Sequence, residues 1–313
     1  MQIVLPGALP DANAAQALFP HIPQAAPTFA QWLQQGRAHF QAAPWAEAGC
    51  TPYEQWLLRS RHFTAEEGQN LSAGLGPLWT DESAAPGEAV WLAELVHVSP
   101  ARDGAALIPA GDLQIAPTQA ERLLDSAQAL FEGSGFSASS GGALRWRLRV
   151  PPGYSPRCAS PALVSITSVN EWWPQDLEAR PWRRLVNELQ MLWFDHPVNR
   201  EREAEGLLPI NSLWLFGGAR PEQFKPAAPM TDTVTHTDLL SPEIAQDWTA
   251  WLDALSRLEE AVFKPLAATR PSPALVLMGR NEIIEVQPGR TGLLKRLLPQ
   301  KEHAWRTWWL SRN

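Results

Sequence analysis

The residues of this sequence that are best suited to chemistry begin at His196. Pro197 disfavours helical geometry in the residue before it, so one helix ends there and a second helix starts at Pro197. Asn199 and Arg202 are three positions apart and share one face of that second helix. A guanidinium binds phosphate or carboxylate through a planar pair of N–H groups, and an amide adds a neutral donor. This spacing predicts a site for a small anion.

A strand that ends in two glycines follows this helix. Asn211 precedes the apolar residues 212–216, and a diglycine comes directly after them. Glycine at a strand end lets a ligand or another stretch of backbone approach closely. The alternative is a structural role, in which His196 only caps the helix and the arginines pair with neighbouring glutamates. The candidate ligand-binding residues are His196, Asn199, Arg202, Asn211, Gly217 and Gly218.

A second polar cluster lies just before residue 241. His236 and Asp238 are weak candidates for metal ligands, and Asp232 could join them. Two or three such ligands do not make a binuclear metal centre. We therefore expect no metal and no cofactor, with Mn²⁺ or Zn²⁺ entering only if the protein is an active enzyme.

The composition excludes several classes of protein. The chain has 313 residues, a formal net charge of −7 and 2 cysteines. A chain with net negative charge binds nucleic acid weakly, and two cysteines cannot build a disulfide scaffold. The first residues lack a basic signal-peptide start, and no apolar run reaches the roughly 20 residues of a membrane helix. We expect a cytoplasmic protein with no membrane span and no nucleic-acid partner.

Helical and strand patterns alternate along the chain. This order predicts an α/β fold, with α+β as the alternative, in which a mixed sheet is flanked by helices. Thr51 and Glu54 form a capping box that predicts a helix start at Pro52. The expected strands are 1–5, 89–98, 105–108, 143–150, 212–216, 274–278 and 282–286. The expected helices are 28–40, 51–58, 118–131, 185–193, 197–206 and 241–264.

Residues 70–88 are rich in Gly, Ser, Pro and acidic residues and predict a soft domain boundary. They separate an N-terminal segment, 1–88, from an α/β region, 89–313. The first segment is expected to be helical after a short strand, and the sequence leaves open whether it folds independently.

Two local patterns carry further expectations. Arg145, Arg147 and Arg149 alternate with apolar residues, which predicts the exposed face of an antiparallel sheet, with an anion-binding row as the alternative. The Trp-rich tail from Trp305 to Asn313 predicts a docked terminal helix. A surface for a membrane or a protein partner is the alternative for the tail.

The order His-Pro-Val-Asn-x-x-Arg-x-x-x-Gly-x-x-Pro-x-Asn-Ser-x-Trp-x-x-Gly-Gly over residues 196–218 resembles archaeal-type cofactor-independent phosphoglycerate mutases, which belong to the alkaline phosphatase superfamily. More of the chain, from about residue 88 onward, resembles the proteobacterial RpfE-type regulatory family, which is phosphoglycerate-mutase-like. The resemblance implies an α/β fold and strengthens the expected anion site.

The chain also departs from the mutase pattern. The resemblance implies two metal ions held by Asp and His, with the first Asp directly after the N-terminal strand. Here Asp11 is six residues beyond that strand, and the later Asp-His signatures are missing. These departures favour a catalytically degenerate protein.

Three functions follow from these observations. The first is a phosphoglycerate-mutase-like protein without catalysis, which binds a small phosphorylated or carboxylated metabolite in a regulatory role. The second is an active metal-dependent phosphoglycerate mutase or phosphatase. The third is an interaction module that binds a protein partner through Trp-rich surfaces and takes no ligand.

Overall fold

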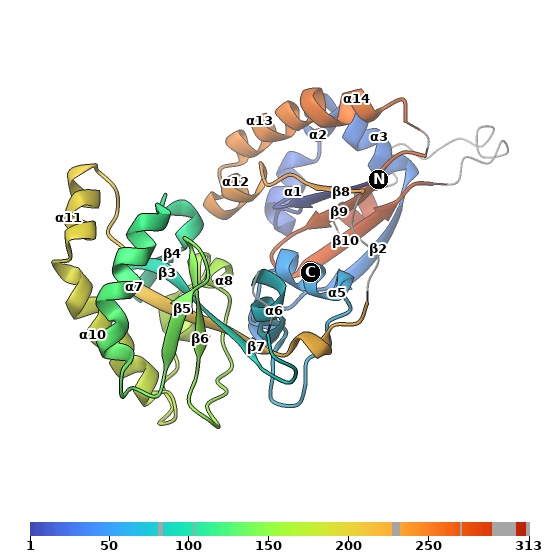
Figure 1. Cartoon of the computed structure of the whole chain (residues 1–313). Helices are drawn as coiled ribbons and strands as arrows, with labels where there is room; N and C mark the ends of the chain where they lie inside the picture. The colour runs from blue at the N-terminus through green and yellow to red at the C-terminus, as the bar shows by residue number, and fades with distance from the viewer. Residues whose placement is uncertain (81–83, 103, 227–231, 270, 290–304, 311–313) are drawn as a thin grey trace, which may run out of the picture. The chain divides into compact units, whose positions relative to one another are not determined.

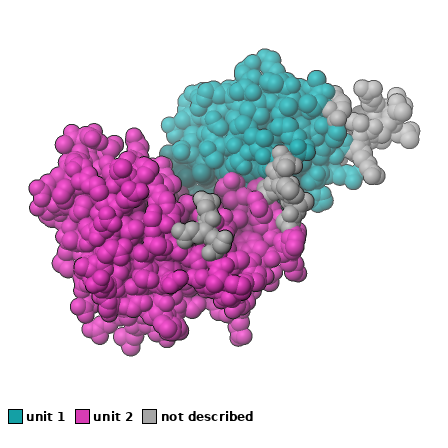
Figure 2. All heavy atoms as spheres, viewed as in Figure 1, with its two compact units in different colours: residues 1–44, 228–313 teal, residues 45–227 magenta. Residues whose placement is uncertain are grey.

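The computed structural model describes residues 1–80, 84–102, 104–226, 232–269, 271–289 and 305–310. The chain forms two compact units, which Figure 2 colours separately. Unit 1 comprises residues 1–44 and 228–313, and unit 2 comprises residues 45–227. The observed division therefore differs from the boundary expected at residue 88, which lies inside unit 2.

Unit 1 is built on a mixed sheet of five strands: β1 (Gln2–Pro6), β2 (Arg37–Ala42), β8 (Thr233–Thr235), β9 (Ala274–Met278) and β10 (Glu282–Gln287). Their order is β2-β10-β9-β1-β8, with β1 parallel to both β8 and β9 (Figure 1). Parallel neighbours need a long crossover connection. The connection from β1 to β8 contains all of unit 2, which makes unit 1 discontinuous in sequence.

The helices of unit 1 bury their apolar residues in one core with this sheet. Trp251 and Trp309 are fully buried there together with Ile3 and Leu5 of β1. The expected docked terminal helix is confirmed over residues 306–310, and residues 311–313 lie outside the described residues. The helices are α1 (Ala12–Leu18), α2 (Ile22–Ala25), α3 (Pro27–Gln35), α12 (Leu240–Ala245), α13 (Trp248–Leu258), the π-helix η4 (Glu259–Phe263), α14 (Lys264–Leu266) and α15 (Arg306–Leu310).

Two predicted helices of unit 1 were wrong in extent. The helix expected over 28–40 ends at Gln35, and the following residues form β2, which pairs with β10. A side chain at Gly36 would meet the Val286 side chain, so the chain passes close to the sheet there. The helix expected over 241–264 is interrupted at Gln246, whose φ of 54° is left-handed.

Unit 2 contains a second sheet, in which every described pair of strands is antiparallel. The long strand β3 (Val90–Ala101) pairs with β4 (Gly104–Ile108), β6 (Arg145–Arg149) and β7 (Ser212–Ala219), and β5 (Ser137–Ser140) pairs with β6. Together the mixed sheet of unit 1, the sheet of unit 2 and the helices that flank them confirm the predicted α/β class.

Helices cover both faces of this second sheet. Trp91 and Trp146 lie in a core with apolar residues of α7 and α10, whereas Leu92 and Phe216 lie in a core with residues of α5, η1 and α6. Among the described residues, no helix combines the length and apolar character needed to cross a bilayer. The helices are α4 (Trp45–Ala48), α5 (Pro52–Ser60), η1 (Leu71–Gly74), α6 (Leu75–Trp79), η2 (Ala110–Asp112), α7 (Pro117–Phe131), α8 (Pro161–Ser165), α9 (Val169–Trp172), α10 (Arg180–Phe194), α11 (Pro197–Ala204) and η3 (Pro221–Gln223).

Of the three arginines that were expected on an exposed face, only Arg149 is exposed. Arg147 is only 7% exposed and pairs with Glu88 at 3.2 Å, and Arg145 pairs with the buried Glu94 at 2.9 Å. The prediction was wrong for Arg145 and Arg147 because this side of the sheet carries a second apolar core and the buried Glu94, which a single strand pattern does not reveal.

The predicted capping box at the start of α5 is confirmed and extends to another helix. Glu54 Oε2 accepts hydrogen bonds from Thr51 N at 2.7 Å and from the hydroxyl of Ser160, the N-cap of α8, at 2.6 Å. Among the described residues, Glu54 Oε1 has no hydrogen-bond partner although it is buried. Burial raises the pKa of Glu54 from 4.5 to about 6, and the hydrogen bonds from Ser160 and Thr51 oppose this shift.

This raised pKa predicts a pH-dependent stability. The folded chain binds the Glu54 proton more tightly than the unfolded chain does. The protonated side chain therefore stabilises the fold fully below pH 4.5, and this stabilisation is lost as the pH rises past about 6. As the pH rises from 4.5 to above 6, we expect the free energy of unfolding of the wild type to fall by about 2 kcal/mol relative to that of Glu54→Gln. Urea unfolding of both proteins from pH 4 to 7.5 measures the difference. The exposed Glu47→Gln is the control, and a wild-type-minus-Gln difference that does not change with pH would contradict the assignment.

Candidate functional site

The predicted break between two helices is confirmed at His196. Its Nδ1 accepts a hydrogen bond from Val198 N at 3.2 Å, and the residue is the N-cap of α11. Burial and the nearby Arg122 lower the pKa of His196, which favours the neutral ring that this acceptor role requires. The imidazole therefore serves the helix start.

Asn199 uses its whole amide to hold two segments together. Its Nδ2 donates to Trp193 O and to Ile210 O, each at 2.8 Å, and its Oδ1 accepts from Ile210 N at 2.8 Å. The residue is only 1% exposed. This amide joins the end of α10 to the start of β7 through backbone groups.

Arg202 is fully buried, with no exposed surface. Its Nε donates to Leu208 O at 2.8 Å, Nη1 to the Gln119 side chain at 2.7 Å and Nη2 to Leu113 O at 2.5 Å. The alternative, in which Arg202 pairs with neighbouring glutamates, is not what the structure shows, since two backbone carbonyls and the Gln119 amide accept its hydrogen bonds. These contacts tie α11 to the first turn of α7 and to the chain before it.

Asn211 points to a different partner. Its side chain exchanges two hydrogen bonds of 2.8 Å with the backbone of Val98 on β3. The predicted residues thus lie close in sequence, but each polar side chain serves a different stretch of protein. Their observed role is to fasten α11 and β7 to the rest of unit 2.

The diglycine lies where two backbones approach each other. A Cβ at Gly217 would stand 2.7 Å from Val90 O and 2.9 Å from Cα of Gly76 on α6, and one at Gly218 would stand 2.4 Å from the Trp91 ring. Both glycines have positive φ values, 93° and 107°. The sequence predicts that either a ligand or another stretch of backbone approaches the diglycine, and the structure shows backbone there.

The two weak metal candidates lie on unit 1, in the loop that follows the parallel strand β8. His236 and Asp238 share the carboxyl edge of the parallel strands with Glu243 and Arg280, whose Oε1 and Nε are 3.3 Å apart. Burial and the field of Asp11 raise the pKa of Glu243. Within the described ranges, no group of three or more His, Cys, Asp and Glu is placed to hold a metal ion. The residues present do not fit a binuclear centre.

A basic hollow in unit 2 is a stronger candidate for an anion. It measures about 320 Å³, within the usual size of small-molecule sites. Among the described residues, no carboxylate lies within 4.0 Å of the two cations that line it. The hollow is lined by Arg61, Pro77, Leu78, Pro221, Phe224 and Lys225.

Three segments that are far apart in the sequence build the basic hollow. Arg61 is the C-cap of α5, Pro77 and Leu78 belong to α6, and the remaining residues belong to or follow η3. Phe63 and Phe224 form a β-bridge, and their ring centroids are 5.0 Å apart. The α5 end and the η3 segment are therefore joined directly.

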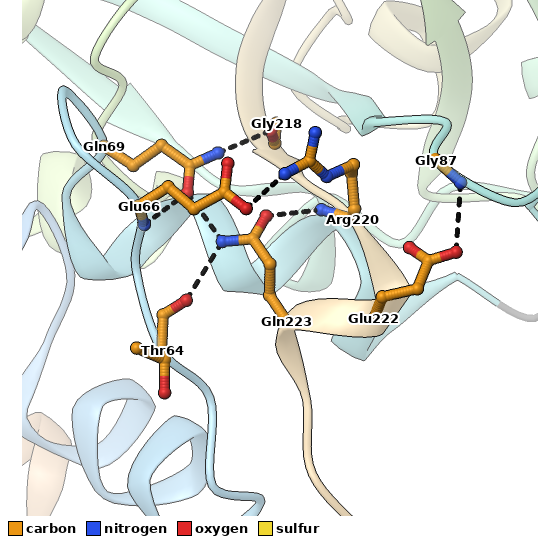
Figure 3. Close-up of polar contacts among 8 residues, drawn as sticks. All are labelled: Thr64, Glu66, Gln69, Gly87, Gly218, Arg220, Glu222 and Gln223. Atoms are coloured by element: carbon orange, nitrogen blue, oxygen red, sulfur yellow. Dashed lines mark hydrogen bonds and ion pairs between the residues drawn. The ribbon is translucent and has the colours of Figure 1, made fainter.

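A polar network beside the hollow braces the same segments (Figure 3). Gln223 Nε2 donates to Thr64 O at 3.0 Å and to Gln69 Oε1 at 2.8 Å, and Gln69 Nε2 donates to Gly218 O at 3.0 Å. Arg220 forms an ion pair with Glu66. The network connects the end of β7 to the loop after α5, and it therefore holds the segments that carry Arg61 and Lys225 in place.

Sequence reasoning missed the hollow because its residues carry no common motif. Arg61 lies 160 or more positions before Pro221 and Lys225, and no periodicity relates them. One signal was present, since Lys225 is among only four lysines in the chain, but this scarcity does not indicate a partner for it.

Comparisons with known proteins give distant structural likenesses. No family model and no curated protein matches the chain. A cofactor-independent phosphoglycerate mutase from Thermoplasma acidophilum is similar with a TM-score of 0.33 and 14% identity, over 93% of this chain and 90% of that one. The PH0037 protein from Pyrococcus horikoshii gives a TM-score of 0.41 and 11% identity, over 93% and 88%. Such distant likenesses assign neither a substrate nor an activity.

The Asn199 contacts predict a structural role that unfolding can measure. Asn199→Ala removes three buried hydrogen bonds, two of them to the N–H and the carbonyl of Ile210, while Trp193 O keeps its bond from His196 N. We therefore expect a loss of about 2–3 kcal/mol in the free energy of unfolding. Arg200→Ala, one position away and exposed, is the matched control and should cost less than about 1 kcal/mol. Equal losses in the two variants would refute the role.

The close backbone approach at the diglycine predicts that α6 tolerates no side chain at Gly76. A Cβ there would lie 2.0 Å from Val90 O. Although alanine favours helices, we expect Gly76→Ala to cost about 1–3 kcal/mol through overpacking. Gly111→Ala, where a Cβ meets open space, should change stability by less than about 0.5 kcal/mol. A stabilised Gly76→Ala in thermal or urea unfolding would disprove the close contact.

Proposed function

We propose that this protein binds a small phosphorylated or carboxylated ligand in the basic hollow of unit 2 and acts in a regulatory role. The observation that carries the proposal is the pair of cations, Arg61 and Lys225, which line a hollow of about 320 Å³ without a carboxylate partner among the described residues. Cations in a concave surface concentrate anions and bind them more strongly than isolated surface cations do.

The geometry of the surrounding chain favours this hollow over the segment at 196–218. Arg202 and Asn199 are buried and already hydrogen-bonded to protein groups, so a ligand would have to break those bonds first. Arg61 and Lys225 are exposed, and among the described residues no carboxylate pairs with them, so a ligand would have no such ion pair to break.

A non-catalytic role fits the donors of the described residues better than metal-dependent catalysis. The carboxyl edge of the parallel strands in unit 1 carries Asp11, Asp238 and Glu243 with Arg280, and it lacks a set of donors placed for a metal ion among those residues. We therefore propose that the protein resembles phosphoglycerate mutases in the class of ligand that it binds, and that it does not convert this ligand.

Calorimetry tests the proposal directly. We expect 3-phosphoglycerate or inorganic phosphate to bind the full chain at low salt and to bind Arg61→Ala/Lys225→Ala at least about tenfold more weakly, because two charge-assisted contacts are lost. Phosphorus NMR should show 3-phosphoglycerate unchanged, with or without added Mn²⁺.

The matched control removes two other exposed cations, one arginine and one lysine. Arg184→Ala/Lys264→Ala changes the net charge by the same amount, and its affinity should equal that of the wild type. Equal weakening in both double variants, or no heat with any anion, would overturn the hollow as the ligand site.

A further inference from the structure

The lining of the basic hollow divides sharply by chemistry. Two residues are cations, Arg61 and Lys225, and the other four are apolar: Pro77, Leu78, Pro221 and Phe224. Inorganic phosphate would pair with the two cations and leave the apolar side chains exposed to water. Apolar surface gains free energy only when a ligand covers it.

The size of the hollow also exceeds that of a bare anion. Its volume of about 320 Å³ corresponds to roughly ten water molecules at about 30 Å³ each. A ligand that fills it therefore has a body several times larger than its charged group.

The apolar wall is already ordered. The Phe224 ring packs against Phe63 with an interplanar angle of 39°, and the half-buried side chain is held by the β-bridge between the two residues. Pro77 and Pro221 have fixed backbone angles. A flat ligand would meet this wall at little cost in side-chain ordering.

From this lining we infer that the ligand of the hollow carries its phosphate or carboxylate on a flat apolar body, such as an aromatic ring. The ring packs against Phe224, Leu78 and the prolines, while the anion contacts Arg61 and Lys225. The inference rests on the proposed function and narrows its ligand class to aryl phosphates, aryl carboxylates and similar anions.

The test compares two phosphomonoesters of equal charge on the full chain. Calorimetry with phenyl phosphate and glycerol 3-phosphate should show phenyl phosphate binding about threefold more tightly, because the apolar surface that a ring can cover is small. Phe224→Leu should abolish this preference while glycerol 3-phosphate binds as before. Phe40→Ala, which removes an exposed ring of unit 1, is the matched control and should keep the preference.

Thermal unfolding first establishes that Phe224→Leu is folded, and Leu78→Ala takes its place if it is not. Equal affinities for the two esters in the wild type, with both lost in Arg61→Ala/Lys225→Ala, would overturn the flat apolar body and leave the proposed anion site standing. A preference that survives both Phe224→Leu and Leu78→Ala would overturn it as well. No binding of either ester would remove the proposed function itself.

Discussion

The buried guanidinium of Arg202 is the constraint on which the outer layer of unit 2 depends. A cation without exposed surface is tolerated only when its N–H groups meet acceptors. Here the acceptors come from the loop before α7, the first turn of α7 and the loop after α11. The positions of these three segments are therefore coupled through one side chain.

The same requirement explains why a motif that looks ready for a ligand serves the fold. Each amide of Asn199 and Asn211 has backbone partners at 2.8 Å. Polar groups that are buried in this way stabilise the protein only when they are satisfied internally. Exposed cations need no internal acceptor, and in the described part of the chain those of the basic hollow have no carboxylate partner.

The two units reflect two ways of building a sheet. The parallel pairing of β1 with β8 and β9 connects the first residues of the chain to the last third, and the antiparallel sheet of unit 2 uses shorter connections. A boundary predicted from composition at residue 88 does not detect this, because a discontinuous unit is defined by strand pairing and not by a change in local sequence.

Local patterns were enough for many elements. Residue types and their spacing predict the capping box at Thr51, the break at Pro197, the strands around Trp91, Trp146 and Trp214, and the last two strands, β9 and β10. Their physical origin is short-range, since caps, proline geometry and apolar alternation act within a few residues. The strand after Gly36 was missed because its pairing with the distant β10 decided it. The break at Gln246 was missed although it is local, since a left-handed Gln246 ends α12 and Asp247 caps the start of α13.

The sequence by itself determined the α/β class, the two helices that meet at His196 and the need for glycine at the end of β7. Only the tertiary structure decided what those residues touch: backbone for Asn199 and Arg202, and α6 for the diglycine. It also brought Arg61 together with Lys225, more than 160 residues away. The reason is that burial and pairing of polar groups depend on contacts across the fold, which spacing along the chain does not encode.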